Sequence, residues 1–168
     1  MTDTIDTPVC FADRTQTRSN PMSAPRGEPI EILLVEDDED HAELTIDALR
    51  RGKIHNRITH VEDGVEAMAY LRREGRYANA RRPDMILLDL HMPRKNGREV
   101  LEEVKSDPEL RRIPVVMLTS CADEKEILGV YDRHVNSYII KPVDLEQFRR
   151  AVMSIEDFWF TVVKLPAA

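Results

Sequence analysis

The sequence has few of the features that indicate a disulfide-bonded or zinc-binding protein. It contains two cysteines, Cys10 and Cys121, which lie far apart and form no CxxC pair. They indicate neither a disulfide framework nor a cysteine-based metal site, and they favour the reducing cytoplasm as the location. The five histidines show no zinc-type spacing. We therefore expect no structural zinc.

Membrane insertion, nucleic-acid binding and nucleotide binding are also not expected. No apolar run approaches the length of about 18 residues that a membrane-spanning helix needs, and no apolar signal segment opens the chain. The net charge is −7, whereas non-specific nucleic-acid binding requires a basic surface. Neither GxxxxGK[ST] nor GxGxxG occurs, so a phosphoryl donor would have to come from another molecule.

The two ends of the chain differ from the part between them. Residues 1–28 are polar and aperiodic, and we expect a disordered leader, with Met22 as the true translation start. Residues 29–157 have the length of one domain with its own core. Residues 158–168 form an apolar extension that contains three of the nine aromatic residues. Such a patch either packs on the flank of the domain or forms a homodimer contact.

Apolar segments of strand length alternate with helical patterns between these ends. We expect strands at residues 30–35, 57–61, 85–89, 113–118 and 137–140. Helices are expected at about residues 39–51, 65–71, 100–105, 122–133 and 145–155. Five such βα units predict an α/β fold in three layers, with a parallel sheet covered by helices on both faces. The natural strand order is the flavodoxin-like 2-1-3-4-5.

The segment Met85–Pro93 carries the first functional signal. Its apolar residues run without alternation into Asp89, which is typical of a parallel strand buried on both faces. Pro93 cannot donate a backbone hydrogen bond, so the strand has ended before it. Asp89 thus lies at the carboxyl end of a strand, where open α/β sheets bind ligands. Taken alone, Asp89 could equally be a strand cap.

Other strands of the predicted sheet also end in polar residues. Glu36 and Asp37 follow the first strand, Thr119 and Ser120 end the fourth, and Lys141 ends the fifth. Because parallel strands end at one edge of the sheet, we expect these groups to lie close to Asp89. Crowded carboxylates resist ionisation unless a cation joins them.

Oxygen ligands that are open to solvent favour Mg²⁺, which can neutralise a nearby phosphoryl group. An aspartate placed between the ion and a lysine can act as a nucleophile and become an acyl phosphate.

In this order, the segments resemble the receiver domain of two-component response regulators. The resemblance covers about residues 30–156 and rests on Leu33–Asp38, Leu87–Pro93, Gly97, Leu118–Ser120 and Tyr138–Pro142. It implies a signalling protein, not an enzyme, that takes a phosphoryl group from the phosphohistidine of a sensor kinase. It also implies slow autodephosphorylation and a change in protein contacts.

The resemblance implies a phosphoacceptor and a set of metal ligands. Asp89 is the expected phosphoacceptor. Asp37, Asp89 and the backbone carbonyl of His91 are expected to bind Mg²⁺ directly. Glu36, where the family more often has aspartate, is expected to hold a metal-bound water.

Three further residues receive a role from the resemblance. Thr119 is expected to bind the phosphoryl group and shift toward it, Tyr138 to act as a rotating switch, and Lys141 to pair with the phosphate. Each also has a simpler interpretation: Thr119 as strand filling, Tyr138 as core and Lys141 as a surface residue.

A narrower resemblance is to the single-domain regulators that are paired with bacterial and cyanobacterial phytochromes. It rests on Asp63–Ala67, Tyr70–Arg73, Tyr77–Ala80 and the ending Ile155–Pro166. It implies a phytochrome-type kinase as partner and a homodimer formed through the last helix and the C-terminal extension.

Two other functions stay open from the sequence. The chain could be an interaction-only pseudo-receiver, although the intact set of Asp37, Asp89 and Lys141 argues against this. It could also be a phosphohydrolase with an aspartyl-phosphate intermediate. Such enzymes carry a second acid two residues after the nucleophile, where this chain has His91.

Overall fold

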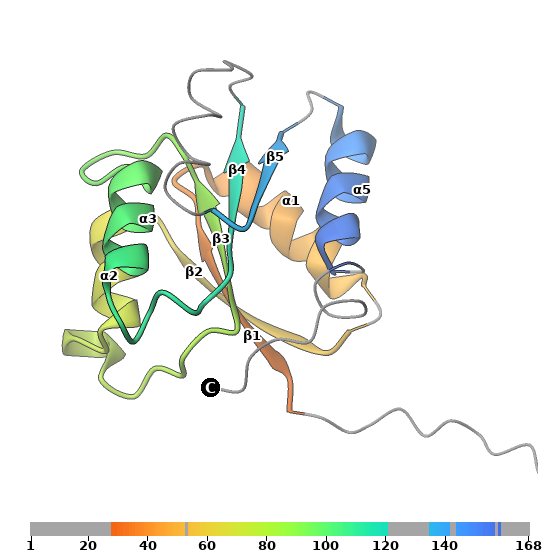
Figure 1. Ribbon diagram of the computed structural model, residues 1–168. Helices are drawn as coiled ribbons and strands as arrows, with labels where there is room; N and C mark the ends of the chain where they lie inside the picture. Colours follow the sequence, from red (N-terminus) through yellow and green to blue (C-terminus); the bar gives the residue numbers. More distant parts are fainter. Residues whose placement is uncertain (1–27, 53, 121–134, 142–143, 157, 159–168) are drawn as a thin grey trace, which may run out of the picture.

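Five parallel strands form the centre of the molecule, and helices of the described residues cover both faces of the sheet (Figure 1). The computed structural model describes residues 28–52, 54–120, 135–141, 144–156 and 158. The elements are β1 (Ile30–Val35), α1 (Glu39–Arg50), β2 (Asn56–Val61), α2 (Gly64–Leu71), the short 3₁₀ helix η1 (Gly75–Tyr77), β3 (Met85–Asp89), α3 (Gly97–Ser106), β4 (Val115–Thr119), β5 (Ser137–Ile140) and α5 (Leu145–Glu156). The expected leader at 1–27, the expected helix at 122–133 and the extension from 159 onward lie outside the described residues.

The strand order is β2-β1-β3-β4-β5, with every neighbouring pair parallel, which confirms the predicted topology. β1, β3 and β4 are buried almost throughout, whereas β2 and β5 are only partly buried. This difference follows from their places, because an edge strand has one neighbour and keeps one side open to solvent.

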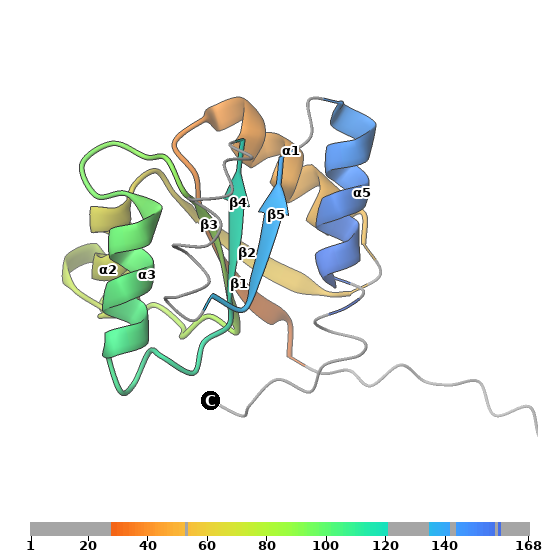
Figure 2. The same ribbon diagram turned by 45° about the horizontal axis from the view of Figure 1, so that its top comes forward.

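Side chains that alternate along the central strands divide the core into two halves. Leu33 and Leu88 belong to the half under α2 and α3, whereas Leu34 and Leu87 belong to the half under α1 and α5. Figures 1 and 2 show the same separation, with α2 and α3 on one face of the sheet and α1 and α5 on the other. Strands covered on both faces read as continuous apolar runs, which is why β3 lacks alternation.

The register places the carboxyl ends of the central strands level with one another. Val35 pairs with Leu88, and Asp89 pairs with Leu118 one step along the sheet. The pattern continues to β5, where the Lys141 N–H donates to the Thr119 carbonyl over 2.6 Å. Residues that follow these strands therefore lie together at the carboxyl edge of the sheet.

Two elements begin more than one residue away from the expected start. β4 begins at Val115 instead of residue 113, because the Ile113 N–H donates to Leu110 in a turn and Pro114 has no N–H. α3 spans Gly97–Ser106 instead of 100–105, because Asn96 and Glu99 form a capping box that starts the helix earlier.

The last helix, α5, begins at Leu145, where the sequence predicts it. The Asp144 carboxylate accepts from the Gln147 N–H over 2.8 Å, as expected of an N-cap.

Within the described part of the chain, no helix is both long and apolar enough to cross a membrane.

Gly97 packs the start of α3 directly against the end of β3. Its N–H donates to the Leu90 carbonyl, and a Cβ at this position would lie 2.1 Å from the Asp89 carbonyl oxygen. Such an atom cannot be accommodated unless the backbone moves, so the substitution would also displace the strand end that carries Asp89.

We predict that Gly97→Ala lowers the free energy of unfolding by about 1–3 kcal/mol through overpacking, measured by urea denaturation. Gly75→Ala is the matched control, because a Cβ there meets no atom within 4 Å while the backbone φ is +53°. It is expected to lose about 1 kcal/mol from the left-handed backbone alone. A smaller loss at residue 97 than at residue 75 would contradict the crowding seen here.

Candidate metal site at the carboxyl edge of the sheet

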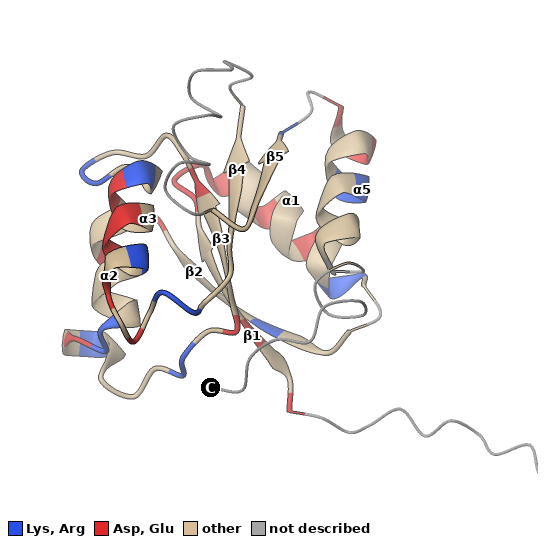
Figure 3. Cartoon of the chain, in the orientation of Figure 1, with Lys and Arg blue, Asp and Glu red and all other residues tan. Residues whose placement is uncertain are grey.

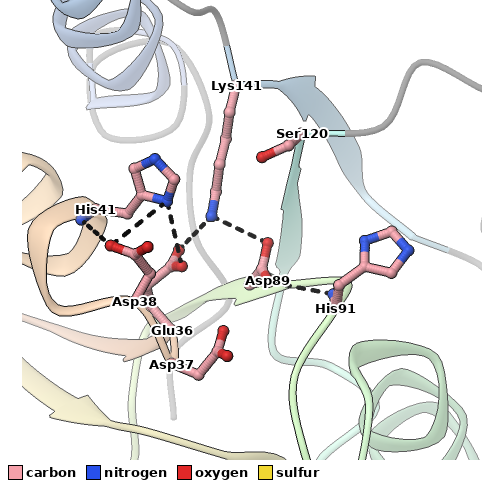
Figure 4. A pocket seen from close by; sticks show the side chains of 8 residues that line it. All are labelled: Glu36, Asp37, Asp38, His41, Asp89, His91, Ser120 and Lys141. Atoms are coloured by element: carbon pink, nitrogen blue, oxygen red, sulfur yellow. Dashed lines mark hydrogen bonds and ion pairs between the residues drawn. The ribbon is translucent and has the colours of Figure 1, made fainter.

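A pocket of about 490 Å³ opens at the carboxyl edge of the sheet (Figure 4). It is lined by Glu36, Asp37, Asp38, His41, Asp89, His91, Ser120 and Lys141. The lining comes from the ends of β1, β3, β4 and β5 and from the first turn of α1. The pocket is thus a product of the parallel sheet, as predicted from the strand ends.

Lys141 lies between two buried carboxylates. Its Nζ is 2.5 Å from Glu36 Oε2 and 3.0 Å from Asp89 Oδ1. The three side chains are 4 %, 1 % and 7 % exposed, respectively. Removing one partner from such a group would leave an uncompensated buried charge, so the ammonium group holds the site together.

The pKa of Glu36 is raised above its ordinary value. Burial is the largest cause, and the neighbouring Asp89 charge adds to it, whereas the hydrogen bond and charge of Lys141 oppose the rise. Because the folded state disfavours the charged form, the contribution of Glu36 to stability is greatest at low pH and is lost as the pH rises through the raised pKa. The site therefore resists carrying its full negative charge.

Three carboxylates of the pocket form a set that fits a divalent cation. One oxygen from each of Glu36, Asp37 and Asp89 lies within 4.8 Å of the other two. Asp37 is exposed, so solvent can reach the cluster. Two carboxylates and one exposed acid face a single ammonium group from Lys141, which leaves negative charge in excess. Carboxylate oxygens with access to water are the donors that hard divalent ions prefer.

The residues after β3 fix the Asp89 carboxylate. The His91 N–H donates to Asp89 Oδ2 over 3.1 Å, so Oδ1 is held by Lys141 and Oδ2 by the backbone. The imidazole of His91 is exposed and points away from Asp89 (Figure 4). The contact of His91 with this carboxylate thus comes from its backbone.

The structure places the two expected switch residues away from the pocket lining. Thr119 is fully buried at the end of β4, and the following Ser120 lines the pocket instead. Tyr138 is partly buried and packs against the core half under α2 and α3. The roles expected of Thr119 and Tyr138 stay predictions.

His41 is a pocket residue that was not predicted. Its Nδ1 lies 3.8 Å from both Glu36 Oε1 and Asp38 Oδ1. The Asp38 carboxylate caps α1 by accepting the His41 N–H, and this bond is the main cause that lowers the pKa of Asp38. The capping signal of Asp38 was visible in the sequence, and because the capped turn faces the pocket, it could have located His41 as well.

Comparison with known proteins identifies the class. Residues 32–153 match the response regulator receiver domain family. This chain belongs to that family. Together with the pocket, the match establishes a signalling protein with an acidic cluster suited to a divalent cation.

Two individual proteins of known name are similar to this chain over most of its length. The chain is 44% identical to response regulator Rcp1 of Synechocystis sp. over 147 residues, which are 88% of this chain and 100% of Rcp1. It is 42% identical over 133 residues to a probable methanogenesis regulatory protein, FilR2, of Methanothrix harundinacea, covering 79% of this chain and 84% of FilR2.

Two solved structures of response regulators are also similar to this chain. The phosphorylated cyanobacterial phytochrome response regulator RcpA superposes with a TM-score of 0.80 at 50% identity, covering 83% of this chain and 99% of RcpA. The Mn²⁺-bound form of Rcp1 also gives 0.80, at 44% identity, covering 83% of this chain and 100% of Rcp1. The recognition made from the sequence is thereby confirmed.

We predict that a divalent cation stabilises the fold through the acidic cluster. Mn²⁺ at 100 times its dissociation constant should raise the free energy of unfolding by about 2.7 kcal/mol. Asp37→Asn and Asp89→Asn should each lose most of this gain in urea denaturation at pH 7.5.

Asp40→Asn is the control, because it removes an equal charge from the exposed first turn of α1 outside the cluster. An equal loss of cation stabilisation in this control would show that the effect comes from overall charge and not from the site.

Proposed function

We propose that this protein receives a phosphoryl group on Asp89 from the phosphohistidine of a sensor histidine kinase, with Mg²⁺ as the cation, in the cytoplasm. The observation that supports this most directly is the placement of the Asp89 carboxylate. It lies at the pocket between the Lys141 ammonium group and the oxygens of Glu36 and Asp37.

The residues of the pocket can prepare the attack. The ion pair with Lys141 and the hydrogen bond from the His91 N–H fix the orientation of the Asp89 carboxylate. A carboxylate oxygen of Asp89 attacks phosphorus, the P–N bond to the kinase histidine breaks, and its electron pair returns to the imidazole. Glu36, Asp37, Asp89 and the His91 carbonyl would hold Mg²⁺, which neutralises charge on the phosphoryl oxygens when bound.

Lys141 takes a second role once Asp89 carries the phosphoryl group. The added negative charge lies beside an ammonium group that is already shared with Glu36. Lys141 then pairs with the phosphoryl oxygens by charge-assisted hydrogen bonds. Its bond to Glu36 is weakened in exchange, so phosphorylation changes the balance of charges within the buried site. Water later hydrolyses the acyl phosphate.

The signal leaves the site through a shift between two conformations. Thr119 moves toward the phosphoryl group and Tyr138 rotates, and the population shifts toward the form that binds partners. Support comes from the register, because Tyr138 sits opposite Met117 on β4, two residues before Thr119. A change at the end of β4 is thereby passed to β5 and the adjacent α5.

A phytochrome-type kinase is the proposed partner. The phytochrome response regulator RcpA is 50% identical to this chain, and two bacteriophytochrome response regulators, AtBRR and RtBRR, are 41% and 44% identical. The similarity supports a shared type of partner without specifying which kinase it is.

We predict that a small phosphodonor with Mg²⁺ adds one hydroxylamine-sensitive phosphoryl group to the wild type and none to Asp89→Asn, measured by intact mass. Asp40→Asn is expected to label normally. An unlabelled wild type would favour an interaction-only pseudo-receiver, and sustained turnover of free phosphoesters would favour a phosphohydrolase.

A homodimer through α5 and the C-terminal extension is the second part of the proposal. Three large apolar side chains are exposed along α5 and just beyond it, at Leu145, Met153 and Phe158, and Ile140 on the adjacent β5 is exposed as well. Apolar groups that are exposed along one helix and on a neighbouring strand favour burial against a second copy.

Truncation after Asp157 is expected to reduce the mass measured by light scattering from dimer to monomer. Removal of residues 2–27 serves as the control and should leave the dimer intact. An unchanged mass after C-terminal truncation would contradict a dimer that depends on the extension.

A further inference from the structure

Asp63 is a fully buried carboxylate that the proposed phosphoryl transfer does not use. It caps α2 by accepting the N–H groups of Val65 and Glu66 over 2.7 Å and 2.9 Å. A third donor is the guanidinium of Arg94, which belongs to the loop between β3 and α3. Capping accounts for the first two bonds. The third connects α2 to the loop that follows Asp89.

Arg94 occupies a backbone conformation that arginine rarely adopts. Its φ is +64°, in the left-handed region that disfavours any residue with a Cβ. Its side chain is 62% exposed, so burial of apolar surface does not compensate for this cost. The bond to the buried Asp63 carboxylate is a specific reason for an arginine at this position, because charge-assisted bonds are the strong ones.

Lys95, the next residue, also holds this loop in place. The Lys95 carbonyl accepts from the Gly64 N–H over 3.2 Å, and a Cβ on Gly64 would lie 2.4 Å from that carbonyl oxygen. Lys95 Nζ also pairs with Glu103 on α3. Basic residues accordingly mark the loop before α3 in Figure 3. The loop is therefore docked closely on the first turn of α2 and on α3.

These contacts fix both ends of a short segment. Asp89 belongs to β3, and the Arg94–Lys95 pair is held on α2 and α3. His91 lies between them, and its backbone carbonyl is a proposed cation ligand. Metal ligands bind well when groups outside the coordination sphere fix their orientation.

We propose that Arg94 is a positioning residue: by binding Asp63 it fixes the loop that carries the His91 carbonyl, and thereby sets the affinity of the site for its divalent cation. This inference rests on the proposed function of the site. Arg94 itself touches neither the cation nor the phosphoryl group. Loss of the bond affects phosphorylation of Asp89 when the cation is limiting and not when it is saturating.

The test measures Mn²⁺ binding by electron paramagnetic resonance in the full chain and its variants. Arg94→Gly removes the guanidinium and leaves a residue that tolerates the left-handed backbone. Its dissociation constant for Mn²⁺ is expected to rise about 10-fold, the lower end of the range for groups that orient a ligand. Arg94→Lys is expected to restore part of the affinity. Arg94→Gly is preferred to Arg94→Ala, because alanine keeps a Cβ that disfavours the left-handed backbone at this position.

Phosphorylation provides a readout that a general loss of structure would not produce. With a small phosphodonor, Arg94→Gly is expected to need about 10-fold more Mg²⁺ for half-maximal labelling, while the rate at saturating Mg²⁺ stays within about twofold of wild type. Asp63→Asn, which keeps a good N-cap, should show the same shift. The double variant should show no further shift, since both changes remove one bond.

Arg81→Ala is the matched control, because Arg81 pairs with Glu28 and Glu31 at the opposite edge of the sheet. It removes the same charge and should leave Mn²⁺ binding unchanged. Wild-type Mn²⁺ affinity in Arg94→Gly, or additive shifts in the double variant, would overturn the role of Arg94 alone. A wild type that binds no Mn²⁺ and accepts no phosphoryl group would overturn the proposed function itself, and this inference with it.

Discussion

The structure depends on an excess of negative charge that one ammonium group only partly balances. Lys141 binds both Glu36 and Asp89 inside the protein, and the exposed Asp37 adds a third carboxylate beside them. Burial raises the pKa of Glu36, and the charge of Asp89 adds to this rise, although Lys141 opposes it. Such a site gains stability from a divalent cation, and the same placement makes Asp89 a suitable phosphoryl acceptor.

The sheet brings these groups together because parallel strands end at one edge. Apolar residues on both faces of β1, β3 and β4 fix the register, and the register sets the level at which each polar residue emerges. Close contacts then hold the edge in place: Gly97 lets α3 approach the Asp89 backbone, and Gly64 lets α2 approach the following loop. Backbone packing beside the charged residues thus helps to determine how the charges meet.

The path from the site to the surface follows from the same packing. Thr119 and Lys141 are joined by a backbone hydrogen bond between β4 and β5, and α5 follows β5 in the chain. On the opposite side, Asp63 and Arg94 connect α2 to the loop after Asp89. In the proposed mechanism, the first side passes a change at Asp89 to a partner, and the second keeps the His91 carbonyl in place.

The sequence alone determined the strand order and the meeting of Glu36, Asp37, Asp89 and Lys141 at one pocket, because continuous apolar runs and the polar residues at their ends are local patterns. It determined neither which of Thr119 and Ser120 lines the pocket, nor that His41 lies beside Glu36. The sequence also did not predict the bond between Asp63 and Arg94, which lie 31 residues apart. Side-chain direction and long-range pairing depend on register, helix placement and close backbone contacts, which only the tertiary structure decides.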